Sequence, residues 1–237
     1  MNKNKTEWEI AQELEPIHWS ENVEVISKKE YQDKIKHRAN LLLSICNPYF
    51  KNSVSKMSIL EIGGGATPMV DFIDCKEAVS LDPLANFYLE TFPFLKERNV
   101  QYDQGKMEEL PYTDEKFDFI ICRNAIDHVE DINKCLFESK RVLKKDGVFY
   151  LAINTFSGLL YLYKAINKDK EHPYTFNIRS FKKTVLNSGF KLSKEIIDSE
   201  HHKHFEEMES KTWWKVVLRK LFLKFDSYHF IELILKK

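Results

Sequence analysis

The sequence predicts an α/β fold in which a doubly wound, mostly parallel sheet carries helices on both faces. The first observation is the segment 58–65, Ser-Ile-Leu-Glu-Ile-Gly-Gly-Gly, in which a short apolar strand runs into three glycines. The second is the alternation of short apolar strands with helix-compatible stretches from there onward. The third is that glycine or polar residues follow these strands, at the positions where an open sheet binds its ligands.

The composition is that of an ordinary globular domain. The 237 residues include 36 basic and 36 acidic residues, so the net charge is zero and a large polyanionic partner such as RNA or DNA is disfavoured. The four cysteines form no CxxC pair, which is typical of a reducing compartment. No secretory signal and no apolar run of roughly 20 residues is visible. We therefore expect a cytoplasmic protein without a membrane span.

The first 50 residues are expected to form a helical cap. Residues 1–26 are polar with scattered aromatic residues and show little periodicity. A helix is expected to begin at Ser27, because Ser27 and Glu30 have the spacing of a capping box, and to end at Asn47-Pro48. The residues that fall on its apolar face are Tyr31, Ile35, Leu42 and Cys46.

Strands and helices alternate over the rest of the chain. Runs rich in β-branched and aromatic residues predict strands at 58–62, 78–81, 100–102, 117–122, 148–153, 190–197 and 228–236. A helical stretch at 84–96 is interrupted by Pro93. Asp131 and Asn177 are expected to cap two further helices, the second of which ends at Gly189.

Two patterns near the C-terminus have ordinary explanations. Residues 211–225 combine an apolar face with basic side chains and no acidic residue, and a helix packed between the last two strands explains them better than contact with a membrane surface. The stretch 201–204, His-His-Lys-His, lacks partners at i and i+4 on an apolar helix. We therefore expect no metal site.

The glycine turn and an acidic residue stand in a fixed order along the predicted sheet. Gly63, Gly64 and Gly65 follow the first strand, and Asp82 follows the second strand, 82 − 65 = 17 residues later. Glycine has no Cβ, so a ligand can approach the backbone closely. A carboxylate at the end of the second strand can accept hydrogen bonds from both hydroxyls of a ribose. The sequence therefore predicts a nucleotide-type site at this edge.

On these segments the chain resembles the class I S-adenosylmethionine-dependent methyltransferases, and it is most similar to the large group acting on small molecules. The resemblance covers roughly residues 55–155, with a weaker likeness to the C-terminus. The matching segments, in the family's order, are Ile-Leu-Glu-Ile-Gly-Gly-Gly at 59–65, Leu-Asp-Pro at 81–83, Glu-Glu-Leu-Pro at 108–111, Phe-Asp-Phe-Ile at 117–120, Asp-His-Val at 127–129 and Arg-Val-Leu-Lys-Lys-Asp-Gly-Val at 141–148.

The resemblance implies a seven-stranded sheet, S-adenosylmethionine as the cofactor and S-adenosylhomocysteine as the product. It implies one methyltransferase domain over 1–237, with a cap at 1–50, a cofactor-binding core at 55–155 and an acceptor side with the C-terminal strands at 156–237. The implied cofactor contacts are Glu61, Gly63, Gly64 and Gly65 at the methionine end, Asp82 and Pro83 at the ribose, Met107 and Glu108 at the adenine, and Arg123 and Asn124 on the methionine side.

Candidate catalytic residues follow from position in this fold. His128 lies after the fourth strand, beside the expected position of the transferred methyl, and is a candidate general base; Asp127 shares its turn. His172, in the loop after the fifth strand, is an alternative base. Arg38 is the candidate for the methionine carboxylate on grounds of charge, with Tyr31 and His37 on the same helix as alternatives.

Two positions depart from the family's pattern. Thr67 and then Pro68 occupy the place of the third glycine, and Lys106 stands where an aspartate usually accepts from the adenine amino group. A protonated lysine cannot accept a hydrogen bond, so backbone atoms or Glu108 would have to substitute. These departures motivate one alternative, a non-catalytic partner or sensor protein that binds S-adenosylmethionine.

The expected reaction is methyl transfer to an oxygen or nitrogen of a small-molecule acceptor, for example a sugar or another biosynthetic metabolite. A nicotinamide-dependent oxidoreductase is disfavoured because the nucleotide fingerprint calls for glycine or alanine where this chain has Pro68. RNA or DNA methylation is disfavoured by the zero net charge and by the absence of a proline-aromatic box after the fourth strand.

Overall fold

A computed structural model describes residues 7–166, 174–198 and 228–237. Its seven-stranded sheet has the order β3-β2-β1-β4-β5-β7-β6. The strands are β1 (Ser58–Ile62), β2 (Glu77–Asp82), β3 (Gln101–Gln104), β4 (Phe117–Arg123), β5 (Leu143–Phe156), β6 (Lys191–Asp198) and β7 (Tyr228–Lys236). The predicted α/β fold and its seven strands are confirmed. The predicted first and last residues of each strand lie within three residues of the observed ones, except that β5 begins five residues earlier than predicted.

The sheet is parallel from β3 to β5, and β7 runs antiparallel to both of its neighbours. The order reverses at β1, which pairs with β2 on one side and β4 on the other. Ile62 at the end of β1 is level with Leu81 of β2 and with Cys122 of β4. The turns that follow these three strands are therefore brought together at one edge of the sheet, at the point where an open sheet binds its ligand.

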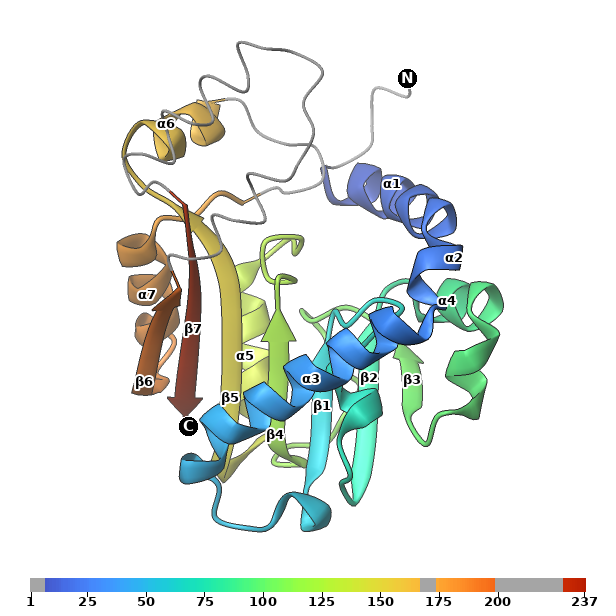
Figure 1. Cartoon of the computed structure of the whole chain (residues 1–237). Coiled ribbons are helices and arrows are strands. Elements are labelled where there is room, and N and C mark those ends of the chain that lie inside the picture. Colours follow the sequence, from blue (N-terminus) through green and yellow to red (C-terminus); the bar gives the residue numbers. More distant parts are fainter. Residues whose placement is uncertain (1–6, 167–173, 199–227) are drawn as a thin grey trace.

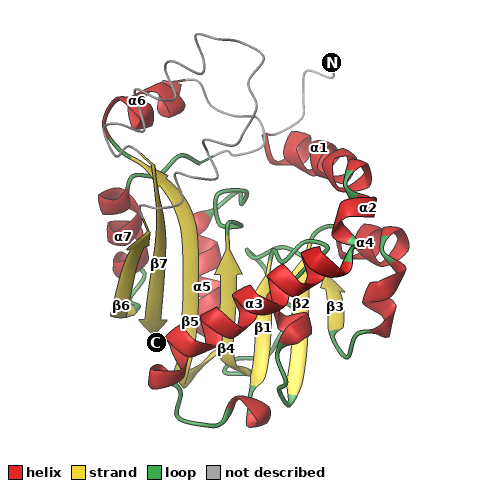
Figure 2. Ribbon diagram, viewed as in Figure 1, coloured by secondary structure: helices red, strands yellow, loops and turns green. Residues whose placement is uncertain are grey.

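Helices lie on both faces of the sheet (Figure 1, Figure 2). The helices are α1 (Glu7–Glu21), α2 (Val23–Ile26), α3 (Lys29–Cys46), α4 (Ala85–Thr91), α5 (Ile132–Val142), α6 (Gly158–Ile166) and α7 (Ile178–Asn187). The long helix α3 crosses one face, and α5 and α7 lie on the other. Both α1 and α6 lie beyond the edge formed by the carboxyl ends of the parallel strands.

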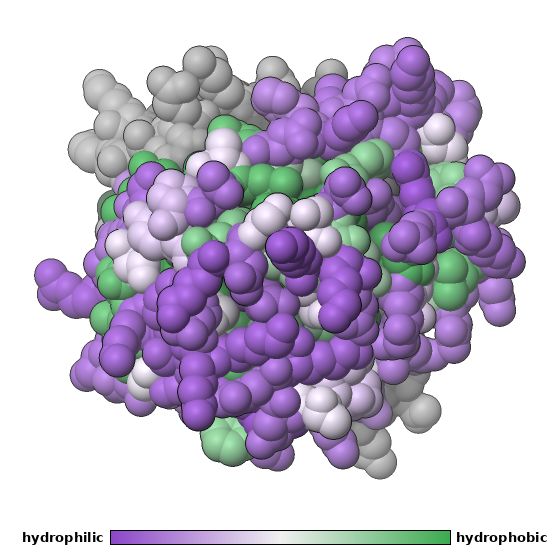
Figure 3. Space-filling view, turned by 90° about the horizontal axis from the view of Figure 1, so that it is seen from below, coloured by the Kyte–Doolittle hydropathy of each residue, from purple (hydrophilic) through white to green (hydrophobic). Residues whose placement is uncertain are grey.

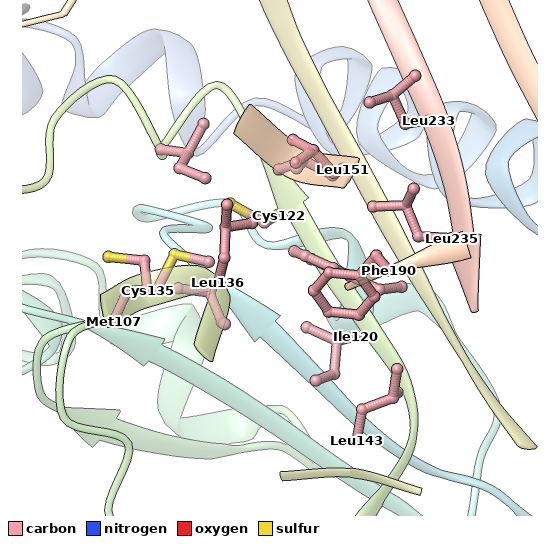
Figure 4. Packing of buried hydrophobic residues seen from close by; sticks show 14 of the residues in the cluster. Met107, Ile120, Cys122, Cys135, Leu136, Leu143, Leu151, Phe190, Leu233 and Leu235 are labelled. Atoms are coloured by element: carbon pink, nitrogen blue, oxygen red, sulfur yellow. The ribbon is translucent and has the colours of Figure 1, made fainter. Parts of the chain in front are cut away.

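The largest buried cluster lies between the sheet and the helices α5 and α7. Figure 4 shows Ile120 of β4, Leu235 of β7 and Phe190 packed together, with Cys135 of α5 beside Met107. Burying such side chains contributes about 25 cal/mol per Å² of apolar surface removed from water. A second cluster joins the opposite face of the sheet to α3 through Ile35, Leu42 and Cys46, the side chains predicted to be apolar contacts of that helix.

The predicted N-terminal capping residues are confirmed for two helices and wrong for a third. Asp131 accepts hydrogen bonds from the backbone N–H groups of Asn133 and Lys134, and Asn177 caps α7 in the same way. Ser27 does not cap α3, because residues 23–26 already form α2 and the Ser27 N–H donates to the Val23 carbonyl. The helix begins at Lys29 without a side-chain cap.

Three helices are missing from the element-by-element prediction. Residues 1–26 are part of the expected helical cap, but no individual helix is predicted there; residues 7–26 form α1 and α2, and α1 presents a partly polar face to a pocket and therefore shows no strong hydrophobic period. The third, the short helix α6, is apolar over most of its length. The stretch 84–96 divides as expected at Pro93, into α4 and a 3₁₀ turn over Pro93–Glu97.

The face at the amino ends of the parallel strands is mostly hydrophilic (Figure 3). Ion pairs lie at this end of the sheet, with Lys51 Nζ 2.6 Å from Asp146 Oδ1 and Lys144 Nζ 2.8 Å from Asp118 Oδ2. In the part of the chain that the structure describes, every helix is too short or too polar to cross a membrane. The groups that can bind a nucleotide gather at the opposite edge.

Candidate active site

The glycine turn brings the backbone into close contact with three neighbouring elements. Gly63 and Gly65 have φ of +69° and +61°, which side-chain-bearing residues rarely adopt. A Cβ on Gly63 would lie 2.3 Å from Cβ of Ala125, and one on Gly65 would lie 2.6 Å from Cζ2 of Trp19. On Gly64 it would meet Pro68 at 2.5 Å. The turn therefore requires glycine at each position.

Glu61 lies behind this turn rather than on the wall of a pocket. Its carboxylate is buried and accepts a hydrogen bond of 2.7 Å from the backbone N–H of Val70, in the 3₁₀ turn Met69–Phe72. Burial raises the pKa of Glu61 to about 7, while the backbone donors and the nearby Arg123 lower it. In this structure Glu61 fixes the segment that follows the glycine turn.

Asp82 at the end of β2 is held by two backbone donors. Its Oδ2 accepts from the N–H of Gly65 at 3.1 Å and its Oδ1 from the N–H of Leu84 at 2.9 Å. Burial and the nearby Glu15 raise the pKa of Asp82 and both backbone hydrogen bonds lower it, and together they bring this pKa to about 6. Each carboxylate oxygen has a second lone pair, so Asp82 retains the capacity to accept from two further donors.

A pocket of about 70 Å³ lies at this edge of the sheet. The predicted site residues that line it are Gly63, Asp82, Pro83, Met107, Glu108, Asn124 and His128. Three residues of α1 line the opposite wall, namely Trp8, Gln12 and Glu15. The pocket therefore combines the turns after β1, β2, β3 and β4 with one helix from outside the predicted core.

The two charged residues after β3 are both engaged. Nζ of Lys106 lies 3.5 Å from the ring centroid of Trp8 and 3.5 Å from Oε1 of Glu130. Glu108 Oε1 accepts from the backbone N–H groups of Glu130 at 2.6 Å and Asp131 at 3.3 Å. Lys106 thus joins α1 to the turn before α5, and Glu108 fixes that turn.

Asn124 has strained backbone geometry, as residues at functional sites often do. Its φ is +51°, in the left-handed region that asparagine tolerates better than most residues, and its N–H donates to the Ala152 carbonyl at 2.9 Å. Its Oδ1 is buried at the pocket and accepts no hydrogen bond from the described residues. The strained turn places an amide oxygen where a bound ligand can reach it.

Arg123 and Arg38 lie on the α3 side of the sheet, away from the wall of this pocket. The guanidinium of Arg123 lies 4.6 Å from the ring centroid of Phe230. Partial burial and the nearby Arg123 lower the pKa of Arg38, which Glu61 and Tyr31 raise. The two arginines and Glu61 thus form one charged group beside the glycine turn.

Asp127 and His128 lie together after β4. Nε2 of His128 is 4.0 Å from Oδ1 of Asp127. The His128 side chain is 25% exposed and lines the pocket, whereas that of Asp127 is 12% exposed. His128 is also a charge neighbour of Asp82. The structure therefore brings His128 to the candidate site and places Asp127 behind it.

Other predicted features lie outside the described residues. These are His172, the histidines at 201–204 and the basic stretch 211–225. Within the described ranges no three histidine, cysteine, aspartate or glutamate side chains lie close enough to hold a metal ion.

Several residues at the site that the prediction missed come from α1, and others, such as Ala125 and Val129, come from the turn after β4. Trp8, Gln12, Glu15 and Trp19 are spaced by four, three and four residues, which places them on one face of a helix. Trp19 contacts Gly65 and packs edge-on against Tyr88, with ring centroids 5.4 Å apart. The spacing was visible in the sequence, but half of the stripe is polar, so a search for apolar periodicity overlooks it.

Comparison with known proteins identifies the domain that carries this site. Residues 60–151 match the family model of a methyltransferase domain. The uncharacterized methyltransferase YcgJ of Bacillus subtilis is 37% identical over 98 residues, which are 39% of this chain and 39% of that protein. The ubiquinone/menaquinone biosynthesis C-methyltransferase UbiE of Rickettsia akari is 44% identical over 52 residues, 22% of this chain and 21% of that one. The matches thus span well under half of these relatives.

Solved structures show the same fold over most of the chain. The YcgJ protein of Bacillus subtilis has a TM-score of 0.60 at 19% identity and covers 85% of this chain and 99% of its own. Geranyl diphosphate C-methyltransferase of Streptomyces coelicolor was solved with S-adenosyl-L-homocysteine. It has a TM-score of 0.64 at 11% identity, and the match covers 89% of this chain and 85% of that one. The match assigns a methyltransferase domain to residues 60–151, and the strand order agrees with the fold of the class I S-adenosylmethionine-dependent methyltransferases.

Proposed function

We propose that this protein transfers the methyl group of S-adenosylmethionine to an oxygen or nitrogen of a small-molecule acceptor. The observation that carries the proposal is the pocket between Gly63 and Asp82, most of whose lining residues lie inside the matched methyltransferase domain. Two of the similar proteins carry small molecules in their names, a quinone in one and geranyl diphosphate in the other, which supports that acceptor class. The neutral net charge supports it as well.

In this proposal different residues bind the ribose, the adenine and the methionine part of the cofactor. Asp82 accepts from the ribose hydroxyls, beside Pro83, and the adenine lies along Met107 and Glu108. The glycine turn and Asn124 line the methionine end. Arg123 and Arg38 supply positive charge for the methionine carboxylate, and Glu61 holds the turn in place. Residues 1–50 then act as a cap, 55–155 as the cofactor-binding core and 156–237 as the acceptor side of a single domain.

The chemistry needs little more than alignment and one proton acceptor. When bound, the cofactor supplies an electrophilic methyl group on a sulfonium. The pocket holds the donor by its nucleoside end, so that orientation supplies much of the rate. His128 takes the proton that a hydroxyl or amine acceptor loses, and Asp127 stabilises the resulting imidazolium across 4.0 Å.

Replacing the proposed base, His128, should lower the turnover rate without changing the affinity for the cofactor. We expect His128→Ala to lower kcat by about 10²–10⁴-fold, the usual contribution of a general base, with little change in the Kd for S-adenosylhomocysteine. His172→Ala tests the alternative base in the same assay. Equal losses of binding and turnover in both variants would contradict a catalytic role for either histidine.

The affinity for the cofactor should depend on pH through Asp82. The ionised carboxylate accepts from the ribose hydroxyls, so cofactor binding favours ionised Asp82. With the pKa raised to about 6, we expect the affinity to rise as pH increases from 5 through 6 and to level off near pH 7. Calorimetric titration with S-adenosylhomocysteine measures this. Asp82→Asn should bind more weakly with no such rise, and an equal rise in the variant would contradict the assignment.

The acceptor class can be tested with methyl-labelled S-adenosylmethionine. Wild type and Asp82→Ala are each incubated with separate protein, nucleic-acid and low-molecular-mass fractions of a cell extract, and the label is followed by chromatography. We expect wild type alone to place label in the low-molecular-mass fraction. Label found only in macromolecules would contradict the small-molecule acceptor. Tight cofactor binding without label in any fraction would favour the non-catalytic alternative.

A further inference from the structure

The inner face of α1 runs along the length of the candidate cofactor pocket. Trp8 contacts Lys106 at one end, and Glu15 is a charge neighbour of Asp82 at the other. Seven residues of helix separate Trp8 and Glu15, a rise of about 10 Å. Gln12 lies between them on the same face and lines the same pocket. Its carboxamide is therefore placed between the ribose carboxylate and the residues after β3.

Gln12 brings an acceptor into the pocket that the described residues leave unused. Its Oε1 is buried, and no donor among the described residues bonds to it. Leaving such an oxygen without a donor is unfavourable, so a donor from a ligand would stabilise the closed arrangement. Gln12 lies on the wall of the pocket and not on the outer surface of α1, so a ligand in the pocket can supply this donor.

The residues on the wall that faces Gln12 have few free hydrogen-bond acceptors for a donor on a bound ligand. Lys106 carries only donors, and its ammonium is already shared between Trp8 and Glu130. The Oε1 of Glu108 is occupied by two backbone N–H groups. A base with an exocyclic amino group, lying between these residues and α1, would meet the Gln12 amide edge-on. Glutamine matches adenine well, because its oxygen accepts from the amino group while its NH₂ donates to a ring nitrogen.

We propose that Gln12 recognises the adenine of the cofactor through its carboxamide, and that α1 forms the outer wall of the nucleoside site, joined to the core by the contact of Lys106 with Trp8. The inference rests on the proposed function and assigns base recognition to a helix outside the matched domain. In this arrangement α1 closes over a bound nucleoside, and Lys106 holds the helix instead of contacting the base.

Paired ligands and variants test this role. Calorimetry compares S-adenosylhomocysteine with its 6-deamino purine analogue on wild type, Gln12→Ala, Gln12→Glu and Ile17→Ala. Ile17, 56% exposed, lies on the opposite face of α1 and serves as the matched control. We expect wild type to prefer the amino-bearing ligand about tenfold. Gln12→Ala should abolish that preference by weakening S-adenosylhomocysteine about tenfold more than the analogue, since only S-adenosylhomocysteine also loses the bond to its amino group.

The remaining variants separate recognition from packing. Gln12→Glu keeps an acceptor for the amino group and should keep the preference, and Ile17→Ala should bind both ligands as wild type does. Loss of affinity for both ligands to the same extent in Gln12→Ala, or no loss for either, would overturn the role of Gln12 while leaving the cofactor site intact. Failure of wild type to bind either ligand would overturn the proposed function, and this inference with it.

Discussion

Asp82→Ala should weaken binding of S-adenosylhomocysteine by about 100-fold or more. The variant removes the acceptor for two ribose hydroxyls, and hydrogen bonds to a charged group contribute about 1.5–3 kcal/mol each. It also frees the N–H groups of Gly65 and Leu84, which Asp82 now holds at 3.1 and 2.9 Å, so the hydrogen bond from Gly63 N–H to the Leu81 carbonyl remains to join the glycine turn to β2. Titration calorimetry on the purified variant measures the change in Kd.

A matched carboxylate on the neighbouring strand provides the control for this variant. Asp103 of β3 is level with Leu81, one residue before Asp82, and accepts from the Tyr112 hydroxyl at 2.8 Å without lining the pocket. We expect Asp103→Asn to leave the Kd unchanged. If both variants weakened binding equally, Asp82 would be acting through the stability of the sheet edge rather than through the ribose.

Gly63→Ala should reduce both stability and cofactor affinity. At φ +69° a left-handed conformation costs an L-residue about 1–2 kcal/mol, and the new Cβ would lie 2.3 Å from Cβ of Ala125. Moving Ala125 disturbs the strained turn at Asn124 on the pocket wall. We expect Tm to fall by roughly 4–8 °C for a loss of about 2 kcal/mol, and cofactor affinity to fall at least tenfold. Differential scanning calorimetry and ligand titration measure the two effects.

Gly158→Ala is the control that separates the effect of backbone strain from the effect of the contact between a new Cβ and Ala125. Gly158 has a comparable φ of +53°, but a Cβ there meets no described atom within 4 Å. We expect it to lower Tm by the strain alone and to leave the affinity unchanged. Equal changes in Tm and affinity for the two alanine variants would show that contact between Gly63 and Ala125 is not what requires glycine.

The core of the site could be predicted from the sequence because its parts depend on short-range chemistry. Gly63 is needed for the backbone conformation after β1, and Asp82 stands at the end of the next strand in space, so strand order alone brings them together. His128 is placed by the same rule, through the turn after β4. For Glu61, the resemblance implied a contact with the cofactor, whereas the structure engages its carboxylate with Val70 behind the turn.

The helix α1 could not be predicted because its packing is not based on an apolar face. Its inner surface carries two tryptophans, an amide and a carboxylate, and it contains Pro16, which removes one helical hydrogen bond. A search for hydrophobic periodicity therefore finds no helix there. The contact of Lys106 with Trp8 also depends on side chains nearly 100 residues apart, which no local pattern reveals.

The most direct test of the central claim is calorimetric titration of the wild-type protein with S-adenosylhomocysteine. The account predicts a single site with a micromolar Kd, despite lysine at position 106 and threonine at position 67. Absence of binding at millimolar ligand by a folded protein would contradict it, because the pocket between Gly63 and Asp82 would then not be a cofactor site.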